Sequence, residues 1–300
     1  MSKLLLVHPL FLSKSPEERE AGSPYFPLGL LYLASYVRDN GHEVAVFDGT
    51  FKEDESAFVA CLEEENPDVV GISAVLPTRD MALKLADLAW DANKPVVMGG
   101  PDATRDPIWY LAHPQVDIVG HHEGEQTMVA LLDLAAEGNL LNPLFLKHEL
   151  GIAYRDSFGG PIINDPRPPI ENLDTLPMPA RDLIDMDRYL NTWKEDRGYT
   201  SMTISTTRGC PYGCDWCADA VHGNQYRQRS PESVAQEMKM LRETFQIDRL
   251  RVVDDVDGIE REWIEDWAQA AEDLDAVIPF EGLNKLERED IPMLDVRDDL

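Results

Sequence analysis

The chain has 300 residues, of which 43% are hydrophobic and 28% are charged, so it can bury one or two globular cores. Its 56 Asp and Glu against 27 Lys and Arg give a formal net charge of −29, which repels phosphate backbones and argues against a nucleic-acid partner. No apolar run approaches the roughly 18 residues that cross a bilayer, and the N-terminus is predicted to be a strand rather than an export signal.

Residues 1–140 alternate short apolar runs with longer amphipathic segments, which predicts repeated βα units. Such units build an α/β domain with a doubly wound parallel sheet, in which ligands bind beyond the carboxyl ends of the strands. The loops after the strands are therefore the first place to look for a site. Strands are predicted at residues 4–7, 43–47, 68–73, 95–98 and 116–119, and helices at residues 28–40, 55–65, 79–93, 107–111 and 126–136.

Residues 141–200 are rich in Pro and Asp and are predicted to form a connector with one hairpin, which pairs residues 152–155 with 162–164. A second βα series follows over residues 201–300. Its predicted strands are 201–206, 250–253 and 276–280, and its predicted helices are 231–245 and 261–274.

Three of the four cysteines, Cys210, Cys214 and Cys217, follow the first strand of this second series, whereas Cys61 is expected to be a small core residue of a helix. Such clustering in a chain without an export signal favours metal binding over disulfides. Thiolates are soft ligands suited to iron–sulfur clusters, and three of them on a four-iron cluster leave one iron without a protein ligand. The loop is therefore a candidate site for a 4Fe-4S cluster with one open iron.

The alternative for this loop is a structural zinc site. His222, five residues after the last cysteine, would complete a set of four ligands. Structural zinc usually divides its ligands between two knuckles. The three cysteines here lie on a single loop, which favours the iron–sulfur interpretation.

The spacing C-x3-C-x2-C, with Trp216 directly before the last cysteine, resembles the motif of the radical S-adenosylmethionine (SAM) enzymes. The resemblance implies that the three cysteines ligate the cluster and that its open iron chelates SAM, which is cleaved reductively to a 5′-deoxyadenosyl radical. It also implies that Trp216 lies near the adenine and that Asp254 and Asp255, at the end of the second strand, help to hold SAM. For these aspartates the alternative is a solvated strand end.

Residues 3–137 resemble the cobalamin-binding fold that precedes the radical domain in one large branch of this family. The resemblance rests on Ser73-Ala-Val75 after the third strand and on Gly99-Gly100 after the fourth. It implies that Ser73 bonds the cobalamin tail, that Val75 belongs to the same contact, and that the two glycines let the tail approach the backbone.

Two further strings, at residues 119–126 and 173–182, resemble the G-E-G-E turn of that branch and its linker into the radical domain. The string D-x-H-x-x-G, which supplies a histidine to cobalt in one class of these folds, is absent after the first strand, where His8 stands in a different context. The alternative is a flavodoxin-like domain that serves only as a scaffold, with Ser73 and the glycines as ordinary turn residues.

The fold that the resemblance implies is a cobalamin-binding, flavodoxin-like domain over residues 1–140 and a partial radical-SAM (β/α) barrel over residues 201–300, which has room for about three strands. We therefore expect a fragment, or a partner chain that completes the barrel. The acidic excess is also expected of a surface kept hydrated in concentrated salt, so we predict a salt-adapted cytoplasmic protein.

The expected function is that of a radical SAM enzyme, either a cobalamin-dependent methyltransferase or a cyclase-type enzyme. The resemblance implies a small-molecule substrate, a reductant such as flavodoxin or ferredoxin, and cobalamin as a cofactor beside the 4Fe-4S cluster and SAM. The alternative is a non-catalytic corrin and iron–sulfur binding module that needs a partner chain.

Overall fold

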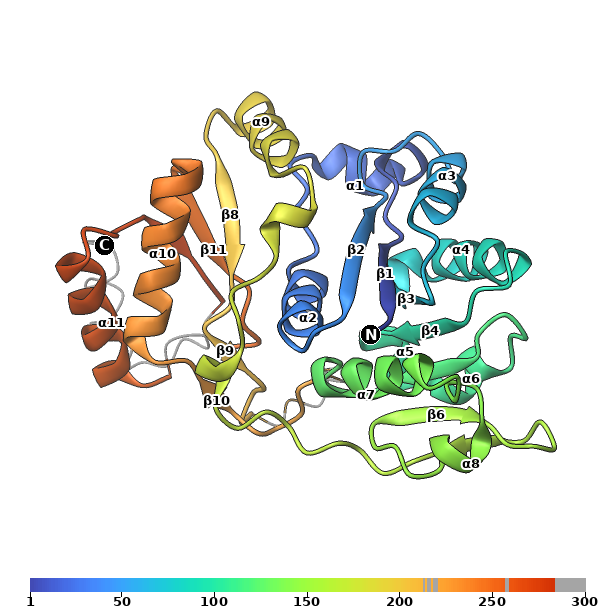
Figure 1. The fold of residues 1–300 in the computed structure, drawn as a ribbon. Coiled ribbons are helices and arrows are strands. Elements are labelled where there is room, and N and C mark those ends of the chain that lie inside the picture. Colours follow the sequence, from blue (N-terminus) through green and yellow to red (C-terminus); the bar gives the residue numbers. More distant parts are fainter. Residues whose placement is uncertain (213, 215–216, 218–220, 257–258, 284–300) are drawn as a thin grey trace.

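The computed structural model describes residues 1–212, 214, 217, 221–256 and 259–283, and Figure 1 shows them as two α/β units side by side. The first unit is built around a sheet with strand order β2-β1-β3-β4-β5-β6-β7, and the second around a smaller sheet with order β12-β11-β8. The predicted fold class, a doubly wound sheet followed by the first units of a (β/α) barrel, is confirmed.

Strands β1 to β5 of the first sheet run parallel, and each overlaps its predicted position. The order 2-1-3-4-5 is that of flavodoxin-like folds. The hairpin predicted in the connector forms as β6 and β7 and extends the β5 edge of this sheet in antiparallel pairing. The strands are Lys3–His8 (β1), Glu43–Asp48 (β2), Val69–Ser73 (β3), Val96–Gly99 (β4), Ile118–Gly120 (β5), Ile152–Arg155 (β6) and Pro161–Ile163 (β7).

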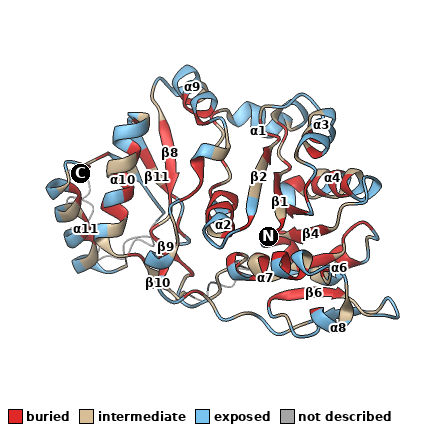
Figure 2. Ribbon diagram, in the orientation of Figure 1, coloured by how far each residue is buried: buried red, intermediate tan, exposed pale blue. Residues whose placement is uncertain are grey.

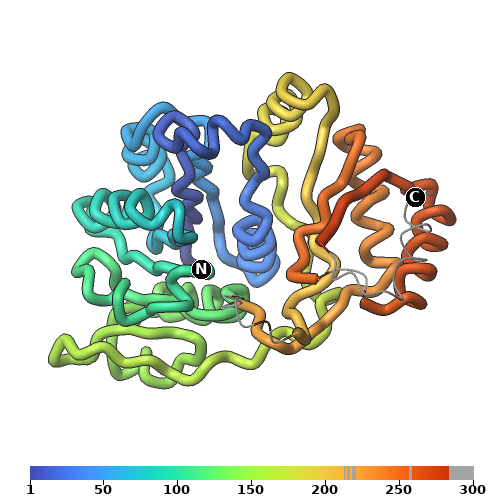
Figure 3. The backbone as a smooth tube through the Cα atoms, turned by 180° about the vertical axis from the view of Figure 1, so that it is seen from behind, coloured from blue at the N-terminus to red at the C-terminus, as the bar shows by residue number. Residues whose placement is uncertain are grey.

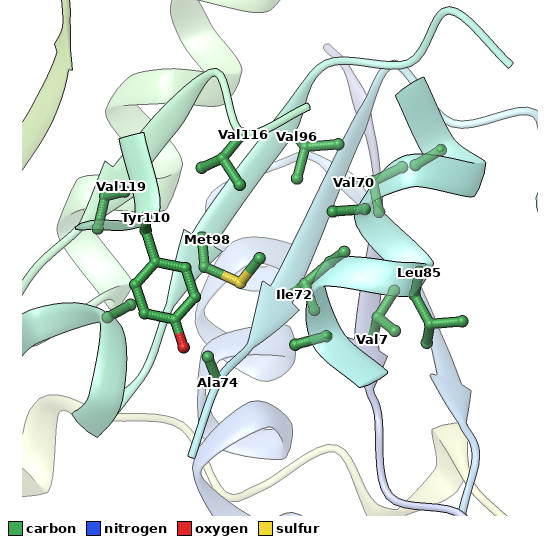
Figure 4. Close-up of a cluster of buried hydrophobic side chains, with 14 of the residues drawn as sticks. Val7, Val70, Ile72, Ala74, Leu85, Val96, Met98, Tyr110, Val116 and Val119 are labelled. Carbon is green, nitrogen blue, oxygen red and sulfur yellow. The ribbon is translucent and has the colours of Figure 1, made fainter. Parts of the chain in front are cut away.

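The first sheet has an apolar core on each face, and Figure 2 shows how its strands are buried between helices. In β1, Leu5 and Val7 enter the core beneath α3, α4, α5 and α6, whereas Leu4 and Leu6 enter the core beneath α2 and α7. Figure 4 shows the first of these cores. The helices are Leu28–Asp39 (α2), Ser56–Glu65 (α3), Arg79–Asp91 (α4), Pro101–Arg105 (α5), Pro107–Leu111 (α6) and Glu125–Ala136 (α7).

The second sheet is parallel, and its strands alternate with helices along the chain. The strand predicted at residues 276–280 was misplaced, because it meets β12 only at Phe280. Ala276 N donates to Ala271 O at 2.8 Å, which ends the preceding helix, and Leu250 N bonds Pro279 O at 2.9 Å just before the ladder. The elements are Ser201–Ile204 (β8), Pro231–Phe245 (α10), Arg249–Val252 (β11), Arg261–Asp273 (α11) and Phe280–Glu281 (β12).

Helix α9, Met186–Arg197, was not predicted and lies in the segment assigned to the connector. Asp185 caps it by accepting from Arg188 N, and Gly198 ends it in the left-handed conformation. Its buried residues Tyr189 and Leu190 pack into the core of the second unit. This part of the connector thus belongs to the second unit, whereas its hairpin belongs to the first sheet.

Helix α2 belongs to both units. Its residues Leu30, Ala34 and Val37 pack on the first sheet, whereas Leu31 and Tyr32 lie in the core of the second unit. Ala180 N, in the linker, also donates to Leu31 O at 3.0 Å. The two units therefore share a continuous apolar contact.

The remaining chain crosses between the units in a long linker, which Figures 1 and 3 show passing from the hairpin to α9. In the part of the chain described by the structure, every helix is too short or too polar to cross a bilayer. The short helices are Leu12–Lys14 (η1), Pro16–Ala21 (α1), Leu76–Thr78 (η2), Pro143–Leu146 (α8), Leu173–Thr175 (η3) and Arg181–Leu183 (η4).

Candidate functional site

The cysteine loop, residues 209–226, returns beside its own starting point. Its ends pair as the antiparallel strands β9, Thr207–Arg208, and β10, Arg227–Gln228. Gly209 has a φ of +81°, and a Cβ there would collide with the carbonyl oxygen of Gln225. Glycine is therefore required at the first residue of the loop, because the two chain segments touch there.

The three cysteines of this loop carry free thiols, half-buried for Cys210 and exposed for Cys214 and Cys217. Cys210 N donates to Gly223 O at 3.2 Å, and Cys217 N donates to Cys214 O at 3.0 Å. Among the described residues, no three His, Cys, Asp or Glu side chains are grouped to hold a metal ion. Three thiols on one loop fit the donor chemistry of an iron–sulfur cluster. Trp216 lies outside the described residues.

The two aspartates after β11 have different environments, since Asp254 is buried and Asp255 is exposed. Asp254 Oδ1 accepts from Thr206 N at 2.8 Å and from Ser205 Oγ at 3.0 Å, and Thr206 Oγ1 donates to Oδ2. Burial raises the pKa of Asp254, and these hydrogen bonds oppose the rise. Asp254 therefore ties the end of β11 to the residues that follow β8, and it is not a solvated strand end. The predicted strand 201–206 ends at Ile204 because its last two residues bond this carboxylate.

A buried ion cluster attaches the base of the cysteine loop to the first unit. Arg208 Nη2 lies 2.6 Å from Glu125 Oε1, while Arg227 Nη1 and His222 Nδ1 lie 2.7 and 3.3 Å from Glu123 Oε1. Burial alone would raise the pKa of Glu123, but hydrogen bonds from His222 and a backbone N–H, with the charges of Arg208 and Arg227, lower it to about 2. His222, considered above as a zinc ligand, is placed beside a carboxylate.

A second buried ion cluster lies between the linker and α10. Glu237 is fully buried, its Oε1 is 2.6 Å from Arg181 Nη2, and its Oε2 accepts from Arg229 Nη1. Arg229 Nη1 also donates to Tyr32 OH at 3.3 Å. The linker string at residues 173–182 thus supplies a buried cation to the second unit. The ion pairs of Arg181 with Glu237 and of Arg208 with Glu125 join residues 56 and 83 positions apart, so no local pattern in the sequence indicates them.

The four residues predicted to contact cobalamin lie together at the carboxyl ends of β3 and β4. Ser73 and Gly99 are register partners, and half-buried Val75 follows two residues later. Gly100 has a φ of +96°, and a Cβ there would lie 2.8 Å from Ala74 O. A Cβ on Gly99 would meet only a carbonyl oxygen, at 3.9 Å, among the described residues. This edge exposes bare backbone, which fits a ligand that approaches the chain closely.

A cavity of about 840 Å³ opens at the carboxyl ends of β1 and β2, against α9. It includes none of the residues predicted to bind cobalamin or the cluster. His8, at the end of β1, has a buried Nε2 without a hydrogen-bond partner among the described residues, and burial lowers its pKa. The cavity is lined by residues that include Ser13, Arg19, Thr50, Phe51, Arg188 and Asn191.

Known proteins resemble this chain in sequence and in fold. Residues 19–132 match the family model of the B12-binding domain. An uncharacterized methyltransferase of Pyrococcus horikoshii is 35% identical over 259 residues, which are 84% of this chain and 53% of the relative. The anaerobic magnesium-protoporphyrin IX monomethyl ester cyclase of Rubrivivax gelatinosus is 27% identical over 244 residues, 80% of this chain and 42% of the relative.

The solved structure of OxsB, a cobalamin-dependent S-adenosylmethionine radical enzyme with aqua-cobalamin bound, has a similar fold. The TM-score is 0.78 at 19% identity, over 93% of this chain and 38% of that chain. This chain therefore spans about half the length of the curated relatives it matches, and less of the solved one. Together the comparisons confirm the expected resemblance: residues 19–132 match the B12-binding domain, and the chain is similar to methyltransferases, one of them a cobalamin-dependent radical SAM methyltransferase, and to a monomethyl ester cyclase.

Proposed function

We propose that this chain binds a 4Fe-4S cluster through Cys210, Cys214 and Cys217, and that it takes part in the reductive cleavage of SAM. The observation that carries the proposal is the cysteine loop itself. Three thiols project from one loop after the first strand of a parallel βα series, and the base of that loop contacts the B12-binding domain. A cluster bound here supplies the electron that breaks a carbon–sulfur bond of SAM, and a bound cobalamin supplies a methyl carrier.

For SAM itself, we propose contacts from Trp216 and Asp255. Asp255 is exposed at the end of β11, whereas both carboxylate oxygens of Asp254 are already bonded by the residues after β8. Asp254 is assigned instead to holding the strand end from which the cysteine loop departs. Its contribution to SAM binding is therefore indirect.

For cobalamin, we propose that Ser73, Val75, Gly99 and Gly100 contact the nucleotide tail. The open backbone above Gly99 and the left-handed turn at Gly100 support close approach of a bulky group to β3 and β4.

The reaction that we propose is methyl transfer to a small molecule, with electrons from a donor of the flavodoxin or ferredoxin type. Methyltransferase is the class of the 35% identical relative. A cyclase-type reaction is the second candidate, because a monomethyl ester cyclase also matches 80% of the chain. In both cases the thiols of the loop and the glycine edge of the first sheet have the same roles.

The test is anaerobic purification and cluster reconstitution of the whole chain, with analysis of iron, sulfide, zinc and cobalt. SAM is then added with dithionite, and 5′-deoxyadenosine is measured. Cys214→Ala is the test variant and Cys61→Ala the matched control, because Cys61 is a half-buried thiol in the first unit, in α3.

The expected result is about four irons per chain. 5′-Deoxyadenosine should form with the wild type and with Cys61→Ala, but not with Cys214→Ala. Zinc without iron would overturn the proposal and favour the zinc-stabilised scaffold. Iron and cobalt bound without SAM cleavage would favour the alternative of a binding module that needs a partner chain.

A further inference from the structure

Glu123, in the turn between β5 and α7, reaches both ends of the cysteine loop with one carboxylate. Its Oε1 lies 3.6 Å from Arg208 Nη1, at the residue before the loop, and 2.7 Å from Arg227 Nη1, at the residue after it. The same oxygen lies 3.3 Å from His222 Nδ1, inside the returning half of the loop. Its Oε2 accepts from Ile170 N in the linker at 2.8 Å.

The base of the loop needs this negative charge. Arg208 and Arg227 are register partners in the β9–β10 pair, so two cations face each other across the strands. Their side chains are only 10% and 9% exposed, and like charges at opposed positions destabilise such a pair. Glu125 contacts Arg208 alone, so among the described residues Glu123 is the carboxylate that offsets both.

Closure of this base is linked to the cysteines. Cys210 comes two residues after Arg208, and its N–H donates to Gly223 O, one residue beyond His222. Next to Cys210, Gly209 lies so close to the backbone of Gln225 that a Cβ on Gly209 would collide with the Gln225 carbonyl oxygen. Separation of β9 from β10 would therefore move Cys210 away from the returning half of the loop.

We propose that Glu123 is a positioning residue through which the B12-binding domain fixes the shape of the cysteine loop. The proposal rests on the proposed function for its meaning, since it links the domain expected to hold cobalamin to the loop expected to hold the cluster. The contacts of Glu123 involve only residues of this chain. The positioning role can therefore be tested before any cofactor binds.

The first test is hydrogen exchange, followed by mass spectrometry, on the whole cofactor-free chain. Glu123→Gln keeps an acceptor for Ile170 N but removes the charge. Peptides that cover residues 207–212 and 223–228 are expected to exchange at least about tenfold faster, because two buried guanidinium groups then face each other. Exchange in β1 and β3 should not change.

The matched control is Glu237→Gln, which removes a more deeply buried carboxylate that also bonds two arginines, Arg181 and Arg229, but bonds no residue of the loop itself. It is expected to loosen α10 and the linker while the loop peptides exchange as in the wild type. Unchanged loop exchange in Glu123→Gln, or equal loosening of the loop in both variants, would refute the proposal.

The second test separates positioning from simple support. After reconstitution, the electron paramagnetic resonance spectrum of the reduced cluster is recorded with and without SAM. Glu123→Gln should alter the spectrum or its response to SAM, whereas Glu237→Gln and the charge-conserving Glu123→Asp should retain most of the wild-type signal. Identical spectra in all variants would contradict the positioning role.

The two proposals fail in distinguishable ways. If the wild-type chain binds no iron, the proposed function fails, yet the exchange experiment still measures the loop. If Glu123→Gln does not fold, His222→Ala is used in its place. His222 is partly exposed, and its substitution removes one of the three side-chain contacts of Glu123 Oε1. An increase of about twofold to threefold in exchange of the returning half of the loop is then expected, and no increase would refute the proposal.

Discussion

The edge of the first sheet and the base of the cysteine loop are stabilised by different interactions. At the sheet edge, Ser73, Gly99 and Gly100 are fixed by parallel ladders and by a bond from Ala74 N to Gly99 O at 2.7 Å. At the loop, a short antiparallel pair is held by buried charges from another part of the chain. The first arrangement is local to one sheet, whereas the second requires both units to be in contact.

This difference has a physical consequence. Ladder hydrogen bonds lose little when one side chain changes, but a buried ion cluster leaves an uncompensated charge when one partner is removed. We therefore expect the sheet edge to respond to added volume and the contacts between units to respond to lost charge.

The largest loss of stability is expected at Glu237, which is fully buried between Arg181 and Arg229. Glu237→Gln leaves two buried cations with one neutral acceptor, and about 3–5 kcal/mol of the free energy of unfolding should be lost. Urea unfolding of the whole chain measures the change. A loss below 1 kcal/mol would mean that the arginines find water or other acceptors.

At the sheet edge, Gly100→Ala is expected to cost roughly 1–3 kcal/mol, because it forces a side chain into a left-handed conformation. Its Cβ would also lie 2.8 Å from Ala74 O. Thermal unfolding measures the loss. Equal stability to the wild type would show that the turn can change its conformation at little cost.

Gly99→Ala should leave the fold intact, because the added Cβ would lie 3.9 Å from its nearest neighbour, the carbonyl oxygen of Gly120. The free energy of unfolding should change by no more than about 0.5 kcal/mol. Cobalamin affinity, measured by equilibrium dialysis, should nevertheless fall about tenfold if the ligand approaches this backbone. The control is Gly29→Ala in α2, where an added Cβ meets no atom within 4 Å and cobalamin affinity should not change.

The charge of Glu123 predicts a pH dependence. Its pKa is about 2 in the folded chain against an ordinary value of 4.5, so its contribution is complete above about pH 4.5 and is lost as the pH falls toward 2. The difference in urea midpoint between the wild type and Glu123→Gln should therefore be constant at neutral pH and shrink below pH 4.5. A constant difference down to pH 2.5 would contradict the assignment.

The smallest effect is expected at the surface pair of Arg38 and Asp182, which also joins the two units. The nitrogen and oxygen lie 2.7 Å apart, but the side chains are 47% and 61% exposed. Solvent screening limits such a pair, so Arg38→Ala should change the free energy of unfolding by about 0.5 kcal/mol or less. Urea unfolding at low and high salt checks this.

The regular elements could be predicted from the sequence where periodicity is clear. Each of the five parallel strands overlaps its predicted range, and α10 begins and ends as predicted. Helix α9 was missed, although its buried residues Met186, Tyr189, Leu190 and Trp193 repeat at helical spacing. The abundant Pro and Asp around it are typical of loops and outweigh that repeat in a prediction from sequence.

The candidate site could be predicted only in part. The cysteines could be named as candidate ligands because their ligand chemistry is local in sequence, and the glycine edge because it resembles a known pattern. The partners of Arg208 and Arg227 were not found, because no local pattern pairs them with carboxylates more than 80 residues away. The bonds of Asp254 to Ser205 and Thr206 likewise depend on how two strands lie beside each other.

Because helix α2 packs in both units, it determines whether the two units can be separated. A piece cut after residue 140 would retain α2 but expose Phe26, Leu31 and Tyr32, which the intact chain covers with α9, β8 and α10. The complementary piece would lose the same side chains from its own core. The first unit therefore cannot be exchanged on its own, and a graft of it onto another protein would need a substitute for the surface that covers this helix.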